Sequence, residues 1–121
     1  MKGPRESAAP VVIVRPRLQL GDTAAIGPGK VELLRAIGER QSISAAAKAM
    51  GLTYKRAWLL VNTLNQGLRE PVVETAKGGK GGGGAQLTDY GISLIRCYDA
   101  LEARIEKAAA KELAAIQDLI E

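Results

Sequence analysis

The hydrophobic pattern in the middle of the chain predicts two helices joined by a tight turn. We expect the stretch AAAKAM to form a short helix, with Ser44 as its N-cap and Gly51 at its end. Thr53 is the expected N-cap of a longer helix. The apolar side chains on the inward face of that helix are Ala57, Val61, Leu64 and Leu68, with Trp58 at its edge. This order favours a helix-turn-helix, although any small helical bundle can contain such a pair.

A further helix and three short strands are predicted around this pair. Apolar residues at helical spacing indicate a helix over about residues 29–40. The stretch VVIVRPRLQL, residues 11–20, has strand composition, and Pro16 would place it at a sheet edge or a bulge. A connector rich in turn residues follows it. VVET (72–75) and AQL (85–87) are expected to be short strands on either side of a glycine-rich stretch.

That stretch reads KGGKGGGGA, and six of the seven residues 78–84 are glycine. It formally matches G-x-G-x-x-G, but a dinucleotide site needs a helix that begins within the last glycines, and here the next helix begins only after Thr88. A P-loop needs Ser or Thr after the lysine, whereas Lys80 is followed by Gly81. A linker between domains is less suitable, because a single helix follows. The pattern therefore favours the tip of a β-hairpin.

A hairpin directly after a helix-turn-helix is typical of a winged helix-turn-helix. Such a fold places its second helix in the major groove of DNA and its wing along the backbone or minor groove. Glycine lets backbone N–H groups approach a phosphate closely, and Lys77 and Lys80 add positive charge. The same loop could instead hold a free oxyanion.

The exposed face of the second helix supplies the candidate base contacts. Lys55, Leu59 and Asn62 lie opposite the apolar stripe, and Arg56 flanks them. Lysine and arginine suit guanine or phosphates, leucine suits a thymine methyl group, and asparagine suits adenine. An ordinary solvated helix would carry similar residues. The complete set of candidate DNA-binding residues is Ser42, Ser44, Thr53, Tyr54, Lys55, Arg56, Leu59, Asn62, Lys77 and Lys80. The serine and threonine hydroxyls would reach phosphates.

A long amphipathic helix is predicted over residues 89–121, with Thr88 as its N-cap. About 30 residues make a helix of ~45 Å, which outruns a domain of this size. We therefore expect it to pair with the same helix of a second chain; the alternative is a helix that folds back over its own domain. The expected dimerisation residues are Leu94, Tyr98, Leu101, Ile105, Leu113 and Ile116.

Composition excludes several classes of protein. The chain has 121 residues, which fits one domain with an appended element. It has no His, and Cys97 is its only cysteine, which argues against most zinc sites, serine-type triads and an internal disulfide. With no paired carboxylates or activated nucleophile in view, we expect neither an enzyme nor a bound metal. No signal peptide or membrane span is predicted, so we expect a cytoplasmic protein.

Charge is distributed unevenly along the chain. Residues 1–88 contain 13 Lys/Arg and 6 Asp/Glu, whereas residues 89–121 contain 4 and 7, within a net charge of +4. The basic part is suited to a polyanion, and the acidic bias would keep the C-terminal helix away from DNA phosphates.

Two stretches, SISAAAKAMGLTYKRAWLLVNTLNQ and PVVETAKGGKGGGGAQLTDYG, resemble the DNA-binding domain of the ModE family of molybdate-responsive transcription regulators. The most specific parts are Tyr54-Lys55-x-Ala57-Trp58, the Gly/Lys loop and Leu87-Thr88-x-Tyr90-Gly91. LysR-type regulators are more distantly similar. The resemblance, over about residues 11–115, implies a winged helix-turn-helix that dimerises on a partly palindromic operator. Full-length members carry a molybdate-binding region that has no counterpart here, so we expect no molybdate or other cofactor.

We therefore predict a mostly α-helical protein with a small β wing. Residues 1–10 are expected to be disordered, 11–88 to form the winged helix-turn-helix, and 89–121 to form the dimerisation helix. The predicted function is that of a transcription regulator that binds double-stranded DNA as a homodimer and controls molybdenum-related genes. A protein-interaction module and a molybdate-binding protein that uses the glycine loop are the alternatives.

Overall fold

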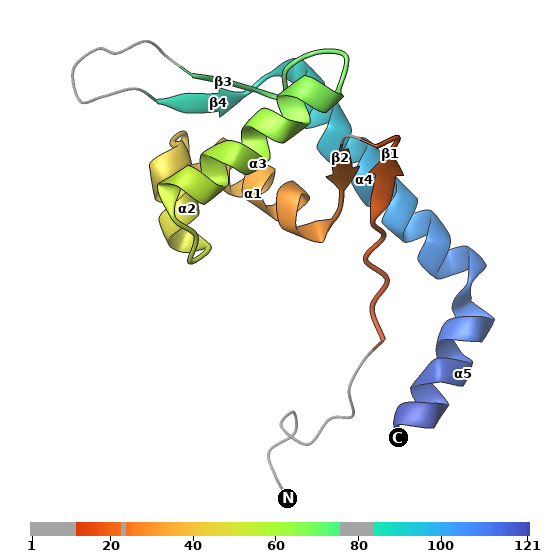
Figure 1. The fold of residues 1–121 in the computed structure, drawn as a ribbon. Coiled ribbons are helices and arrows are strands. Elements are labelled where there is room, and N and C mark those ends of the chain that lie inside the picture. Colours follow the sequence, from red (N-terminus) through yellow and green to blue (C-terminus); the bar gives the residue numbers. More distant parts are fainter. Residues whose placement is uncertain (1–11, 23, 76–83) are drawn as a thin grey trace, which may run out of the picture.

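The computed structural model describes residues 12–22, 24–75 and 84–121, and helices dominate it (Figure 1). The elements in chain order are β1 (Leu18–Leu20), β2 (Ala24–Ile26), α1 (Pro28–Arg40), α2 (Ile43–Ala49), α3 (Tyr54–Gly67), β3 (Val73–Thr75), β4 (Ala85–Leu87), α4 (Asp89–Ala108) and α5 (Ala110–Ile120). α1, α2 and α3 pack together as a head, α4 leads away from it, and α5 continues at an angle to α4 (Figure 1). The strands form two separate antiparallel pairs, β1 with β2 and β3 with β4.

The helix pair begins and ends at residues with clear capping geometry. Thr53 caps α3 as predicted, because its Oγ1 accepts a hydrogen bond from the Arg56 N–H at 3.0 Å. Ser44 was the wrong cap for α2: Ser42 is extended and accepts from the Ala45 N–H at 3.0 Å. Ser44 is instead an exposed residue inside the helix. α2 begins earlier than predicted because Ser42, rather than Ser44, supplies the cap, directly after α1 ends at Gln41 with a φ of 56°.

The N-terminal strand is shorter than predicted and has a nearby partner. Only Leu18–Leu20 is a strand, and it pairs with Ala24–Ile26 inside the segment expected to be a connector. Gly21, with φ of 54°, lies in the turn between them. Pro16 precedes the paired residues, as its missing N–H requires.

The core lies between the three helices of the head and the base of the second hairpin. Its largest fully buried side chains are Val31, Leu33, Leu34, Ile37, Leu64 and Val72. The predicted inward stripe of α3 is confirmed for Ala57, Val61 and Leu64, which are buried, while Leu68 is half-buried. An aliphatic core of this kind matches a chain that contains no Phe.

The second hairpin is held at its base by two polar side chains. Its strands were predicted closely, since Val73–Thr75 and Ala85–Leu87 pair in antiparallel register. From α3, Asn65 Oδ1 accepts from the Val72 N–H at 2.8 Å. From the start of α4, Thr88 Oγ1 donates to the Pro71 carbonyl at 2.7 Å and accepts from the Gly91 N–H at 2.9 Å. The hairpin is thereby fixed to both α3 and α4.

The C-terminal segment is two helices, so the prediction of one continuous helix was wrong. α4 ends at Ala108 and α5 begins at Ala110, and Figure 1 shows α5 bent away from the α4 axis. Alanine is the best helix former, so local propensity does not account for the bend at Ala109. The bent helix instead meets the N-terminal segment, where the Val12 N–H donates to Gln117 Oε1 at 3.0 Å.

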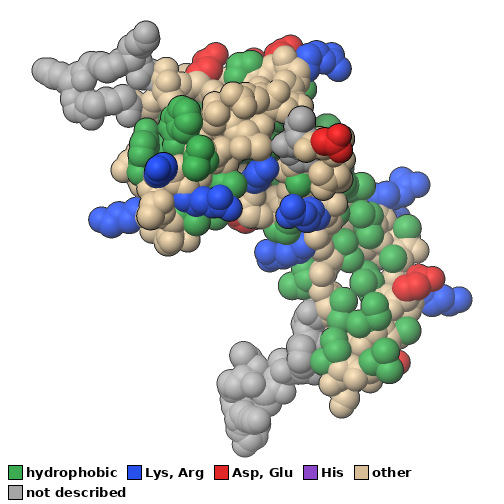
Figure 2. Space-filling model, viewed as in Figure 1, with side chains coloured by type: hydrophobic (Ala, Val, Ile, Leu, Met, Phe, Trp, Pro, Cys, Tyr) green, Lys and Arg blue, Asp and Glu red, His purple; other side chains and the backbone are tan. Residues whose placement is uncertain are grey.

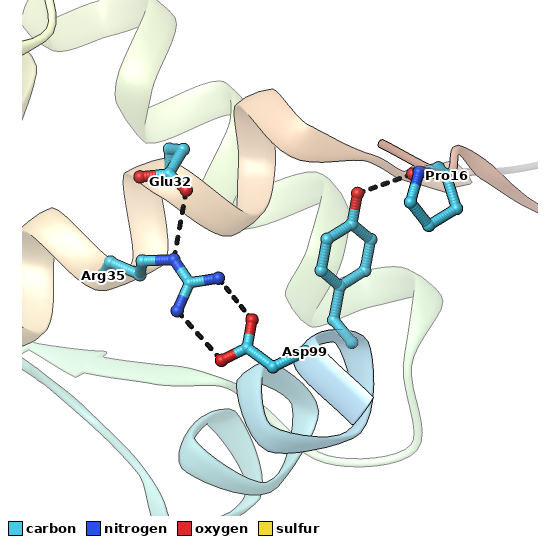
Figure 3. Close-up of polar contacts among 5 residues, drawn as sticks. Pro16, Glu32, Arg35 and Asp99 are labelled. Carbon is cyan, nitrogen blue, oxygen red and sulfur yellow. Dashed lines mark hydrogen bonds and ion pairs between the residues drawn. The ribbon is translucent and has the colours of Figure 1, made fainter. Parts of the chain in front are cut away.

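The first part of α4 belongs to the head. Tyr98 is only 3% exposed, and its hydroxyl donates to the Pro16 carbonyl at 2.6 Å (Figure 3). Beside it, both terminal nitrogens of Arg35 donate to the Asp99 carboxylate, and its Nε donates to Glu32 at 3.1 Å (Figure 3). The hydrogen bond from Arg35 lowers the pKa of Asp99, and Asp99 in turn raises the pKa of Arg35. Tyr98, which was expected at a dimer interface, is thus part of its own protomer's core.

Candidate nucleic-acid interface

The outer face of α3 is the surface that most resembles a DNA-reading element. Tyr54, Lys55 and Leu59 are exposed on its first two turns, with Leu59 at 43% and Tyr54 at 56%. Asn62, one turn further, is half-buried. A helix that exposes its N-terminal turns in this way can enter a major groove without disturbing the core.

Positive charge gathers around the start of α3. Figure 2 shows Lys and Arg side chains on the surface formed by α1, α2 and the beginning of α3. Among the described residues, Lys48, Lys55 and Arg56 are exposed there. Such a concentration of cations supplies the sequence-independent part of DNA affinity.

The structure divides the flanks of α3 into two different environments. On one flank, Arg56 lines a cleft of about 390 Å³ together with Arg17 and Lys30. On the other, Trp58 and Asn62 line a smaller groove of about 160 Å³ that also contains Val73 and Thr75 of β3. The sequence placed Trp58 at the edge of the apolar stripe, and the side chain is in fact 43% exposed between α3 and the hairpin.

The basic cleft was not predicted, because its residues are far apart in the sequence. Lys30 Nζ donates to the Ala25 carbonyl at 2.8 Å, which fixes the ammonium group near the start of α1. Burial, followed by the charges of Arg17 and Arg56, lowers the pKa of Lys30. The three cations therefore lie close enough to repel one another.

The remaining predicted DNA-binding residues lie in different parts of the interface. Ser42 and Thr53 stand at the N-termini of α2 and α3, where their side-chain oxygens accept capping bonds. Ser44 is exposed on α2. Lys77 and Lys80 lie outside the described residues.

The described residues offer neither a metal cluster nor a membrane-spanning helix. No group of three or more His, Cys, Asp and Glu side chains in residues 12–22, 24–75 and 84–121 is placed to hold a metal ion. In the same ranges, no helix has both the length and the apolar character needed to cross a membrane.

A helix pair with an exposed second helix, followed by an antiparallel hairpin, defines a winged helix-turn-helix protein. The hairpin β3–β4 is the wing. Residues 29–92 match the lysR family of bacterial regulatory helix-turn-helix proteins, and the chain belongs to that family.

The relatives that this chain matches include transcriptional regulators and a molybdenum-pterin-binding protein. The chain is 52% identical over 84 residues to the molybdenum-pterin-binding protein MopB of Rhodobacter capsulatus, a match that covers 69% of this chain and 31% of MopB. It is 46% identical over 92 residues to the DNA-binding transcriptional dual regulator ModE of Escherichia coli, which covers 76% and 35% of the two chains. It is 45% identical over 91 residues to the transcriptional regulator ModE of Yersinia pestis, which covers 75% and 35%. In these matches this chain spans about a third of the length of each relative.

A solved structure supports the fold alone. The crystal structure of a LysR family transcriptional regulator matches 69% of this chain and 26% of its own, with a TM-score of 0.51 and 20% sequence identity. The predicted winged helix-turn-helix with its ModE resemblance is therefore confirmed at the level of fold and family.

Proposed function

We propose that the chain binds double-stranded DNA and regulates the transcription of molybdenum-related genes. The single observation that carries this is the outer face of α3, which exposes Tyr54, Lys55 and Leu59 beside a gathering of cations. The relatives named as ModE regulators and as a molybdenum-pterin-binding protein support the choice of genes.

In the proposed complex, α3 lies in the major groove. Lys55 and Leu59 face the base edges, with Lys55 suited to guanine acceptors and Leu59 to a thymine methyl group. The wing follows the backbone, and its position is fixed by the bonds from Asn65 and Thr88. Asn62, on α3, lines the groove between this helix and the wing, where it suits a phosphate or the edge of an adenine.

We propose further that two copies bind a palindromic operator in the cytoplasm, with dimerisation through the C-terminal arm. Of the residues predicted for this role, Leu94 and Tyr98 pack on the head. Leu101, Ile105 and Leu113 are half-buried, and Ile116 is 47% exposed. Leu119 and Ile120 extend the apolar surface, at 85% and 47% exposed. The revised dimer surface is the apolar face of the later part of α4 and of α5, and exposed Lys111 lies on the opposite side of α5. No cofactor is proposed.

Fluorescence anisotropy with two duplexes tests the regulator proposal. A palindromic operator candidate and its scrambled version are titrated across a salt series. We expect affinity to fall steeply with salt and the palindrome to bind more tightly. Lys55→Ala should weaken the palindrome more than the scrambled duplex, because a base contact carries about 1–3 kcal/mol of discrimination. Lys111→Ala, on exposed α5, is the matched control. If the wild-type chain binds neither duplex at low salt, the wing and α3 serve a protein partner instead.

A further inference from the structure

The cleft beside α3 brings together three cations from separate elements. Arg17 precedes β1, Lys30 lies in the first turn of α1, and Arg56 lies in the first turn of α3. The other described lining residues are Ala25, Gly27, Gly29, Met50, Leu52 and Leu60, so no acidic side chain of the described residues lines the cleft. None of the three cations forms an ion pair with another described residue.

The positions of these side chains are set by the fold. The stem of Arg17 lies over Gly27, since a Cβ on that glycine would come within 3.4 Å of Arg17 Cγ. Lys30 uses one of its three donors on the Ala25 carbonyl, which leaves two for a ligand. Arg56 is adjacent to Lys55, so the cleft opens next to the surface proposed to face the major groove. The cations are thus held close together in a defined arrangement.

Electrostatics favour an anion in this cleft. Lys30 is partly desolvated and is repelled by both arginines, which is why its pKa is lowered. The first turn of α1 adds partial positive charge: it contains no acidic residue, and Gly27 provides no side-chain cap. A single negative group between the three cations would relieve the repulsion and accept several charge-assisted hydrogen bonds.

We propose that Arg17, Lys30 and Arg56 together bind one backbone phosphate of DNA, immediately beside the major groove that α3 enters. This rests on the proposed DNA-binding function, because the cleft is continuous with the surface of α3. It assigns Arg56 to the backbone rather than to a base, and it adds Arg17 and Lys30 to the interface. A contact of this kind sets the angle of α3 in the groove but carries no sequence information.

Salt-dependent anisotropy of single variants tests the phosphate grip. Arg17→Gln removes an exposed cation, and we expect it to weaken the operator and scrambled duplexes by the same factor, about tenfold. The slope of log K against log salt should become shallower by about one. Lys30→Gln should act in the same direction, and Arg17→Lys should retain most of the slope. Lys111→Gln removes one positive charge from distant α5 and should change neither duplex.

Each other outcome has a definite meaning. If Arg17→Gln behaves like Lys111→Gln while the wild-type chain binds DNA, the grip is refuted and the proposed function stands. A loss confined to the operator would overturn the phosphate assignment in favour of base reading. If inorganic phosphate raises the melting temperature of the wild-type chain but not of Lys30→Gln, and DNA binding is unchanged in Lys30→Gln, the cleft holds a free anion and the proposal is wrong. Failure of the wild-type chain to bind either duplex would remove the proposed function itself, and this inference with it.

Discussion

Replacing Gly91 with alanine would press a methyl group against the base of the wing. Gly91 is buried in the first turn of α4, directly under the Val72 carbonyl. An alanine Cβ would overlap the carbonyl oxygen and lie 3.1 Å from the Val72 carbonyl carbon and 3.3 Å from its Cα. These are backbone atoms, so rotation of a side chain cannot relieve the contact, and either α4 or the wing must move.

The expected size of this effect follows from two opposing contributions. Overpacking of a close-packed site lowers the free energy of unfolding by about 1–3 kcal/mol, and a backbone clash belongs at the upper end. Alanine is better than glycine inside a helix by about 1 kcal/mol. The net expectation is a loss of about 2 kcal/mol, with a drop in Tm of roughly 5–10 °C. The wing is proposed to contact DNA, so a shift of the wing away from the added methyl group would lower DNA affinity as well.

Urea unfolding followed by far-UV circular dichroism measures the change in stability. Gly29→Ala is the matched control, because a Cβ on Gly29, in the first turn of α1, meets no atom within 4 Å. We expect that variant to be unchanged or slightly more stable. If Gly91→Ala unfolds at the same urea concentration as Gly29→Ala, the close approach of α4 to the wing does not exist as described.

Three further predictions follow from local contacts. Ser42→Ala should lower the free energy of unfolding by about 1 kcal/mol, because it removes the cap of α2. Ser44→Ala should be neutral or slightly stabilising. Equal losses of stability in urea unfolding would contradict the capping assignment. Asp99→Asn should lose less than about 1 kcal/mol at neutral pH, since its ion pair with Arg35 is 33–49% exposed. The pKa of Asp99 is lowered in the folded chain, so its ionised form stabilises the fold above its unfolded pKa, and this contribution is lost as the pH falls through the folded pKa. Measurements of Tm at decreasing pH should show this loss in the wild-type chain and not in Asp99→Asn. Leu119→Glu should shift a dimer towards monomer in sedimentation velocity while leaving urea stability of the head unchanged, and an unchanged mass would remove α5 from the interface.

Elements specified by neighbouring residues could be predicted from the sequence. The stripe of Ala57, Val61 and Leu64 lies at helical spacing, and the Thr53 cap is three residues from the N–H that it accepts from. The two wing strands were recognised because glycines separate two short β-rich stretches. The exposed face of α3 followed from the same periodicity. In each case the determining interactions join residues a few positions apart, so a local pattern is sufficient to reveal them.

Tertiary structure decided the features that join distant residues. Arg17, Lys30 and Arg56 line one cleft although they come from three separate parts of the sequence, before β1, in α1 and in α3. The bond from Tyr98 to Pro16 spans 82 residues and moves Tyr98 from the expected interface into the core. Helical periodicity shows which face of a helix is apolar. It does not show whether that face packs against the core of the same chain or against a second chain.

The break between α4 and α5 and the close contact of Gly91 with the wing also depend on residues far apart in the sequence. Ala109 interrupts a segment of high helix propensity, and the bent α5 contacts Val12 through Gln117. Gly91 reads in the sequence as an ordinary helical glycine, yet the Val72 carbonyl leaves no room for a Cβ. The sequence alone determined the helix pair, the two wing strands and the polar face of α3, because those depend on local spacing. Only the packed chain decided which side chains meet, because that depends on how separate elements approach one another in space.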